Sequence, residues 1–340
     1  MLAERLTSQA LAGSPLKAPE EVAERILAIQ AQDPVGARLA VRSRTKGLSG
    51  SDVDRALNDR SLVISWLNRG TLHLVRSEDF GWLHSLTVPR LATANRTRLK
   101  QEGVSMKQAE KGSKLIIKAL ADGPLGRNEI REVLDGAGVP TANQALVHIL
   151  LFTTIEGSIL RGPVVEGDHK FVLVEDWLGP QEAVDQEVAL AELARRYLAG
   201  HTAADEKDLA KWAGITLGQA RKGLEGISGE IEENDGLLRL KKRRRTAKVP
   251  DVKLLGPFDP ALHGWTAREF LLPEGVERSV VTINGIFKPT ILIEGQVAGI
   301  WTRPAGKVTL DPFRDMTATE ETKLEKETAA VESFLGSGDA

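Results

Sequence analysis

The sequence predicts an α+β protein assembled from small modules, and three observations support this class. Helical segments are followed by two short strands around a turn, and this order recurs three times along the 340 residues. After residue 252 the chain becomes rich in β-branched residues and turn dipeptides. Hydrophobic residues make up 41% of the chain, enough for one large or several small cores.

The three repeats follow the order of a winged helix, in which a helix-turn-helix precedes a β-hairpin. One such match is weak evidence, but three in order are more specific, and their irregular spacing favours tandem modules over a solenoid. The expected helices are 20–30 and 51–58; then 79–101, 105–121, "GRNEIREVLDGAG" and 141–156; then 181–199, 205–213 and 216–226. The expected hairpins are 61–75, 158–174 and 227–240.

The C-terminal part is expected to form a small antiparallel sheet or barrel. Its segment 276–310 carries turn signals at Asn284-Gly285, Glu294-Gly295 and Ala305-Gly306. An amphipathic helix over 320–336 should pack back on the body. The expected domains are modules at 1–78, 79–176 and 177–248 (the third with a basic linker), a β-barrel at 249–313, and a terminal helix and tail at 314–340.

Several function classes are excluded or disfavoured by what the sequence lacks. Without cysteine there is no disulfide or thiol chemistry, and an intracellular location is favoured. There is no signal peptide and no uncharged run of membrane-spanning length, so we expect a soluble cytoplasmic protein without membrane contact. Phosphate-binding glycine loops, a G-x-S-x-G elbow and histidine metal motifs are also missing. We therefore expect no cofactor and no metal.

The charges are segregated along the chain although the net charge is only −2. Basic residues gather in 38–46, 90–118 and 241–248, and acidic residues in 182–192 and 225–235. A nearly neutral protein can in this way present a basic face to DNA phosphates. The alternative is that each run is simply a solvated helix face, and the sequence leaves both interpretations open.

The stretch "ILAIQAQDP" (26–34) contains the most unusual polar pair. Gln30 and Gln32 follow an apolar helical run, and Pro34 disfavours helical dihedrals at Asp33. In extended backbone, residues two apart share a side, so both amides could point at one place. The alternative is an amide pair that ties a helix end to neighbouring backbone.

Four segments resemble the winged-helix DNA glycosylase family (AlkZ/YcaQ-like). They are "LAIQAQDPVGARLAVRSR", "RGTLHLVRSEDF", "LLGPFDPALHGW" and "GIFKPTILIEGQVAGIW", and the resemblance runs from about residue 20 to 313. It implies three tandem winged helices and a C-terminal β-barrel around a concave cleft for duplex DNA. It also implies excision of N-alkylated purines, with unhooking of interstrand crosslinks in some members.

The family's catalytic Gln-Φ-Gln motif matches Gln30-Ala31-Gln32, with alanine as a small version of the apolar residue. The resemblance places further residues at the DNA or near the site. They are Arg38, Arg69, Thr71, His73, Asp259, His263 and Arg303. Without it, His73 is an ordinary strand histidine, Arg69 a solvated turn residue and Asp259-Pro260 a turn.

Glutamine suits a substrate whose leaving group is already cationic. A purine alkylated at N7 or N3 departs without an acid, so the enzyme must mainly position a water, which two amide oxygens can do. We expect a monomeric, monofunctional glycosylase that leaves an abasic site, acts in the nucleoid on duplex DNA with alkylated purines, and uses little or no base flipping. The alternatives are a winged-helix regulator without catalysis and a protein-interaction scaffold.

Overall fold

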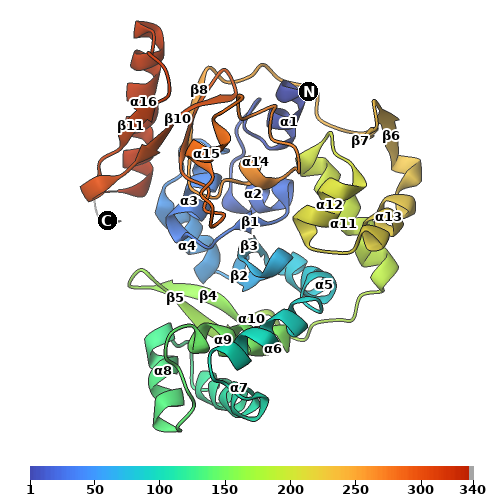
Figure 1. Cartoon of the computed structure of the whole chain (residues 1–340), viewed down its shortest axis with the longest axis vertical. Coiled ribbons are helices and arrows are strands. Elements are labelled where there is room, and N and C mark those ends of the chain that lie inside the picture. Colours follow the sequence, from blue (N-terminus) through green and yellow to red (C-terminus); the bar gives the residue numbers. More distant parts are fainter. Residues whose placement is uncertain (337–340) are drawn as a thin grey trace. The chain divides into compact units, whose positions relative to one another are not determined.

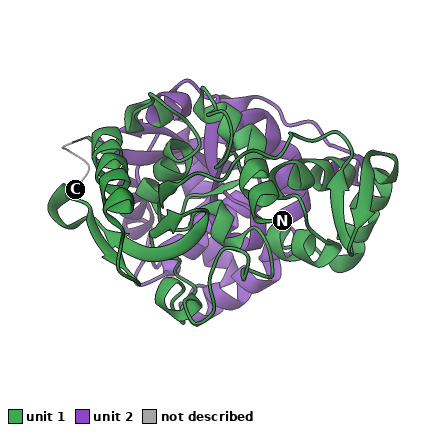
Figure 2. Ribbon diagram, turned by 90° about the horizontal axis from the view of Figure 1, so that it is seen from above, with its two compact units in different colours: residues 1–53, 190–340 green, residues 54–189 purple. Residues whose placement is uncertain are grey.

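The structure is a computed structural model that describes residues 1–336. The chain forms two compact units, coloured separately in Figure 2. Unit 1 comprises residues 1–53 and 190–340, and unit 2 comprises residues 54–189. The first hairpin lies in unit 2, while the helices before it lie mainly in unit 1. The five domains expected from the sequence remain a prediction.

Unit 2 is built on an antiparallel sheet in which strands lie in the order β3-β2-β4-β5. The strands are β2 (Leu62–Trp66), β3 (Leu72–Arg76), β4 (Ile159–Val165) and β5 (Asp168–Leu173), labelled in Figure 1. The hairpins expected at 61–75 and 158–174 are therefore confirmed. The sequence did not predict that they join, which they do through Ile64 of β2 and Arg161 of β4.

The helices of unit 2 flank these hairpins. They are α5 (Ser77–Thr87), α6 (Leu91–Gln101), α7 (Met106–Leu120), α8 (Arg127–Gly136), α9 (Ala145–Ile155) and α10 (Val174–Leu178). The expected continuous helix 79–101 is wrong, because Pro89 has no amide hydrogen to continue the helical bonding and separates α5 from α6. Ser105 and Gln108 form the capping box that begins α7.

Unit 1 contains the chain's N-terminus and its C-terminal half. Its helices are α1 (Leu2–Ser8), α2 (Pro19–Ile26), α3 (Pro34–Arg42), α11 (Gln186–His201), α12 (Glu206–Ala213), α13 (Leu217–Gly226), α14 (Pro260–His263), α15 (Glu277–Val280) and α16 (Ala318–Leu335). The first residues of α11 belong to unit 2, and α4 (Gly50–Asn58) also crosses the boundary. The third expected hairpin is confirmed as β6 (Ile231–Asn234) and β7 (Leu237–Leu240). The terminal helix is confirmed as α16, which begins with a Thr317–Glu320 capping box.

The C-terminal sheet is antiparallel and open. Its strands are β8 (Val252–Leu255), β9 (Thr290–Ile293), β10 (Gln296–Thr302) and β11 (Thr309–Pro312), in the order β11-β10-β9-β8. No pairing of β11 with β8 closes it within the described residues, so the expected barrel is not confirmed. The strand expected from residue 276 is wrong, because residues Glu277–Val280 form the short helix α15.

One apolar cluster joins this sheet to the N-terminal helix. Leu6 and Leu11 are buried with Leu255, Leu262 and Leu292. The core of unit 1 therefore depends on segments from opposite ends of the sequence. None of the helices among residues 1–336 is long and apolar enough to cross a bilayer.

Candidate active site

The Gln30–Gln32 segment lies directly after α2 in unit 1. Helix α2 ends at Ile26, earlier than the expected residue 30, and Ile29–Gln30 form the two-residue strand β1. Gln30 is 7% exposed and Ala31 is 2% exposed, whereas Gln32 is exposed. Within residues 1–336, no side-chain hydrogen bond ties either amide to another residue. Both amides thus retain hydrogen-bonding capacity for a ligand.

The turn before β1 is strained. Leu27 has φ 64° and ψ −52°, and the Ala28 amide donates to the Ile26 carbonyl over 2.8 Å. These dihedrals and this hydrogen bond define a γ-turn with a positive φ at its central residue, the rarer of the two γ-turn types. Such a conformation is costly for a residue with a Cβ and persists only where surrounding packing enforces it, commonly at functional sites. Leu27 is fully buried, so packing holds it there.

Asp33 and Pro34 begin the next helix. The Asp33 side chain accepts a hydrogen bond from the Gly36 amide over 2.8 Å, and Pro34 occupies the first turn of α3. Aspartate is a favoured N-cap residue and proline a favoured first residue of a helix. Asp33 is therefore engaged as a helix cap, and the Asp-Pro pair ends the glutamine segment by starting α3.

Glycines allow α3 to dock on the segment 256–263. A Cβ on Gly36 would lie 2.5 Å from the Pro257 carbonyl oxygen, and one on Gly256 would lie 2.7 Å from the Leu39 Cβ. Real Cβ atoms do not approach so closely, so both positions require glycine. This contact brings "QAQDPVGARL" and "LLGPFDPALH", more than 200 residues apart, to the same place.

A buried ion pair fixes the same contact. Arg44 makes two hydrogen bonds to Asp259, of 2.9 and 2.8 Å, and both side chains are 0% exposed. Arg44 also donates to the Gln9 carbonyl and to the Gln9 side-chain oxygen, and Asp259 caps α14 through the Ala261 amide. Asp259 is thus shielded from solvent, and its ion pair lies just past the C-terminal end of α3.

His263 supports the unusual backbone next to Asp259. Its Nε2 lies 2.9 Å from the Phe258 carbonyl oxygen, and Phe258 has φ 56°. The Phe287 ring packs against both His263 and Phe258, with centroids 5.5 and 6.3 Å apart. His263 is 8% exposed, and its predicted place near the site remains a prediction.

His201 is fully buried within a group of aromatic side chains. Its ring stacks on Tyr197 with centroids 4.6 Å apart and contacts Trp265. Desolvation lowers its pKa to about 3, so it is neutral at physiological pH. The Tyr197 hydroxyl donates to the Gly264 carbonyl, which links this group to the end of α14. A role in proton transfer is disfavoured by this burial.

Unit 2 contains the remaining hairpin residues. Arg69 is exposed in the β2–β3 turn with φ 57°, and Thr71 donates to the Asn68 carbonyl. His73 is 2% exposed, lies opposite Ser65 in the ladder, and has Nδ1 2.9 Å from the Thr71 carbonyl oxygen. The predicted roles of these residues at the DNA remain predictions.

Arg38 and Arg303 make contacts within unit 1. Arg38 is 9% exposed and donates to the Pro34 carbonyl one turn earlier in α3. Arg303 donates to the carbonyl oxygens of Gly306 and Gly336, which ties the β10–β11 connection to the end of α16. Sequence reasoning did not foresee these contacts, nor the Leu27 turn, for which no sequence signal exists.

Two of the three basic runs, 38–46 and 90–118, differ in the surroundings of their cations. In 38–46, Arg42 pairs with Glu327 of α16 and Arg44 with Asp259, so both are structural. The cations on α6 and α7 of unit 2 are mostly exposed. No group of acidic and histidine side chains among residues 1–336 has the arrangement of a metal site.

Comparison with known proteins assigns the family. The model of the DNA glycosylase AlkZ-like family matches residues 23–334. The interstrand DNA cross-link repair glycosylase of Streptomyces sahachiroi is 24% identical, over 99% of this chain and 96% of the relative. The solved structure of Streptomyces sahachiroi DNA glycosylase AlkZ superposes with a TM-score of 0.79 at 23% identity, covering 98% of this chain and 95% of that one, and so shows the same fold. This chain therefore belongs to the AlkZ-like DNA glycosylase family.

Proposed function

We propose that this protein is a monofunctional DNA glycosylase that hydrolyses the N-glycosidic bond of cationic N-alkylated purines in duplex DNA. The observation that carries the proposal is the uncommitted amide pair Gln30 and Gln32, presented after a strained turn and in front of a capped helix. Family membership supports the reaction class. The curated relative is named for interstrand cross-link repair, so the substrate range is proposed to include crosslinked and bulky adducts.

In the proposed mechanism the two amides hold one water beneath the deoxyribose C1′. The alkylated purine carries a positive charge and leaves as a neutral base, and the sugar becomes an oxocarbenium-like cation. The positioned water adds to C1′ and loses its proton to solvent, which leaves an abasic site. The protein contributes orientation and electrostatic stabilisation by the amide carbonyl dipoles. Fixing the amides requires a rigid support, which the buried Arg44–Asp259 pair and the Gly36–Pro257 contact supply.

We further propose that the helix-and-hairpin units are winged helices and that the C-terminal sheet completes the DNA-binding surface. Support comes from chain order: α7, α8 and α9 precede the β4–β5 hairpin, and α11, α12 and α13 precede the β6–β7 hairpin. Helices α2, α3 and α4 precede β2–β3 in the same way. This order matches a helix-turn-helix with a wing.

The test is base release from a duplex that carries one N7-methylguanine, measured under single-turnover conditions. Replacing Gln30 or Gln32 by Ala should slow release by about 100-fold while DNA affinity is retained, because only water positioning is lost. Gln181→Ala, which changes an exposed glutamine in the connection between α10 and α11, is the matched control and should release base at the wild-type rate. Borohydride should trap no covalent complex, since no amine attacks the sugar.

Two outcomes would contradict the proposal. If Gln30→Ala and Gln32→Ala both retain the wild-type rate, the amide pair has no catalytic role. If the wild-type protein binds duplex DNA but releases no base from methylated, bulky or crosslinked purines, a DNA-binding regulator without catalysis is the better description.

A further inference from the structure

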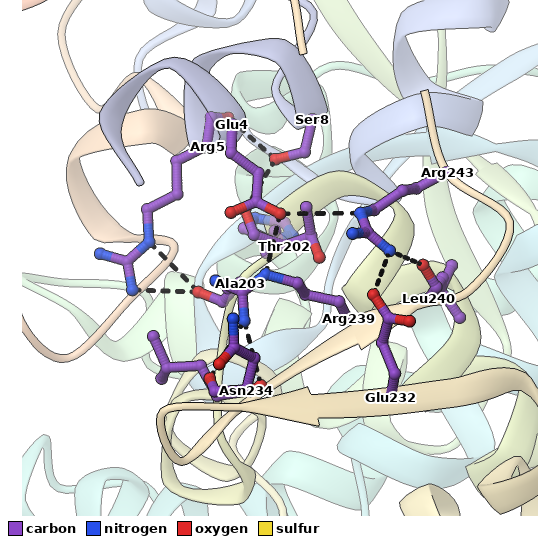
Figure 3. Close-up of polar contacts among 12 residues, drawn as sticks. Glu4, Arg5, Ser8, Thr202, Ala203, Glu232, Asn234, Arg239, Leu240 and Arg243 are labelled. Atoms are coloured by element: carbon purple, nitrogen blue, oxygen red, sulfur yellow. Dashed lines mark hydrogen bonds and ion pairs between the residues drawn. The ribbon is translucent and has the colours of Figure 1, made fainter. Parts of the chain in front are cut away.

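The basic segment Lys241–Lys248 divides into anchored and unpaired cations. Arg243 pairs with Glu232 over 2.7 Å and with Glu4 over 3.7 Å, as Figure 3 shows. Lys241 donates to the Gly229 carbonyl. These contacts tie the segment to the β6–β7 hairpin and to α1. The segment is therefore held in place on unit 1 by some of its own cations.

Arg244 and Arg245 of the same segment are not anchored in this way. Both are exposed, and neither has an ion-pair or hydrogen-bond partner within the described range 1–336. Arg244 lines a cavity of about 410 Å³ together with Arg25 of α2 and Arg196 of α11. Both arginines also line a cavity of about 520 Å³ together with Lys17.

The two cavities form one continuous depression, because Leu16, Glu21 and Arg244 line both. We call this depression the basic groove and define its cations as Lys17, Arg25, Arg196, Arg244 and Arg245. Its two carboxylates are Glu21 and Glu24, so five positive charges face two negative ones. Arg196 also pairs with Glu192 of α11 over 3.8 Å, and the positive charge that remains in excess favours an anionic ligand.

The cations at the floor of the groove are held by backbone groups. Arg25 donates to the Ala199 carbonyl over 3.2 Å, and Arg196 donates to the Glu24 carbonyl over 3.0 Å. Burial lowers the pKa of Arg25 to about 10, and the nearby charge of Arg244 adds to this shift. Both guanidinium groups are thus held in the lining of the same cavity, and a bound anion would stabilise them there.

We propose that the basic groove binds the sugar-phosphate backbone of one DNA strand. The cations of the groove come from four separate segments of unit 1, which suits a ligand with several charges such as the backbone of a DNA strand. The groove lacks aromatic side chains on which bases could stack. This inference rests on the proposed function, because it takes duplex DNA as the substrate.

The experiment compares cations of the same segment. Affinity for an undamaged duplex is measured between 50 and 300 mM salt for wild-type, Arg244→Gln, Arg245→Gln and the control Lys242→Gln. Lys242 is exposed and does not line the groove. Each arginine variant should weaken binding about five- to tenfold at low salt and reduce the salt slope by about 1, because one phosphate contact is lost. Lys242→Gln should leave both quantities near wild-type values.

Three results would overturn the inference. If all three variants change affinity and slope equally, the cations act only through net charge. If none changes either quantity, DNA does not reach the groove. If inorganic phosphate raises the melting temperature of wild-type protein but not of Arg244→Gln, while the DNA slopes stay equal, the groove is a site for a free anion.

Base release at saturating DNA separates this inference from the proposed function. Lys242→Gln should keep the wild-type rate and the wild-type half-saturating DNA concentration, whereas Arg244→Gln and Arg245→Gln should raise the half-saturating DNA concentration. If wild-type protein releases no base but the salt slopes of the variants differ as expected, the proposed activity is wrong and the groove proposal is supported. If wild-type protein releases base and the salt slopes do not differ, the groove proposal is wrong and the proposed activity is supported.

Discussion

The buried pair Arg44–Asp259 should be a main determinant of the stability of unit 1. Both side chains are 0% exposed, so neutralising one partner leaves the other charge away from water. Removing one partner of a buried pair typically costs about 3–5 kcal/mol. Asp259→Asn should therefore lower the free energy of unfolding by about 3 kcal/mol, the low end, because Arg44 keeps its bonds to Gln9 and to the Ala40 carbonyl.

The second function of Asp259 makes the prediction sharper. Its Oδ1 also accepts the Ala261 amide at the start of α14, over 3.0 Å. An asparagine oxygen can keep this cap, whereas alanine cannot, so Asp259→Ala should cost about 1 kcal/mol more than Asp259→Asn. The double variant Arg44→Met/Asp259→Leu should recover much of the loss, since an apolar pair leaves no uncompensated charge.

The assay is urea denaturation of the full chain followed by tryptophan fluorescence, with circular dichroism as a second probe. Coincident transitions are needed to assign a single free energy. A cost below about 1 kcal/mol for Asp259→Asn would refute the reasoning. So would a double variant that is less stable than either single variant.

Two further predictions concern the packing of α3 and the charge beside α16. Gly36→Ala should destabilise unit 1 by about 1–3 kcal/mol, because the new Cβ meets the Pro257 carbonyl oxygen, and should slow base release. Gly218→Ala in α13, where a Cβ would meet only the Thr216 hydroxyl oxygen at 4.0 Å, should do neither. Burial lowers the pKa of Lys253 from 10.5 to about 8 in the folded protein. Between pH 8 and 10.5 the unfolded chain therefore binds more protons than the folded protein. The free energy of unfolding should rise with pH in this range, by up to about 3 kcal/mol. Lys253→Met should flatten this rise when unfolding free energies are compared at pH 7.5 and 10, and an unchanged rise would show that other groups cause it.

Local sequence patterns predicted most elements of the fold. All three hairpins were located, because turn residues separate two short strand-like segments in each, and α16 was located from its amphipathic pattern. Predictions were wrong where a single residue or a contact distant in sequence determined the local structure. Pro89 divides α5 from α6, and residues Glu277–Val280 form a helix despite their β-branched surroundings. The joining of the first two hairpins depends on long-range pairing, which has no local signal.

The sequence by itself determined the family and the segments that matter, because "QAQDP" and "FDP" are short motifs whose residues carry the resemblance. Only the tertiary structure decided what each charged residue does. Arg42 and Arg44 belong to one basic run, yet each is neutralised by a carboxylate far away in the sequence, whereas Arg244 and Arg245 have no such partner among residues 1–336. The physical reason is that the free energy of a charge depends on its burial and its neighbours in space, which chain order does not specify.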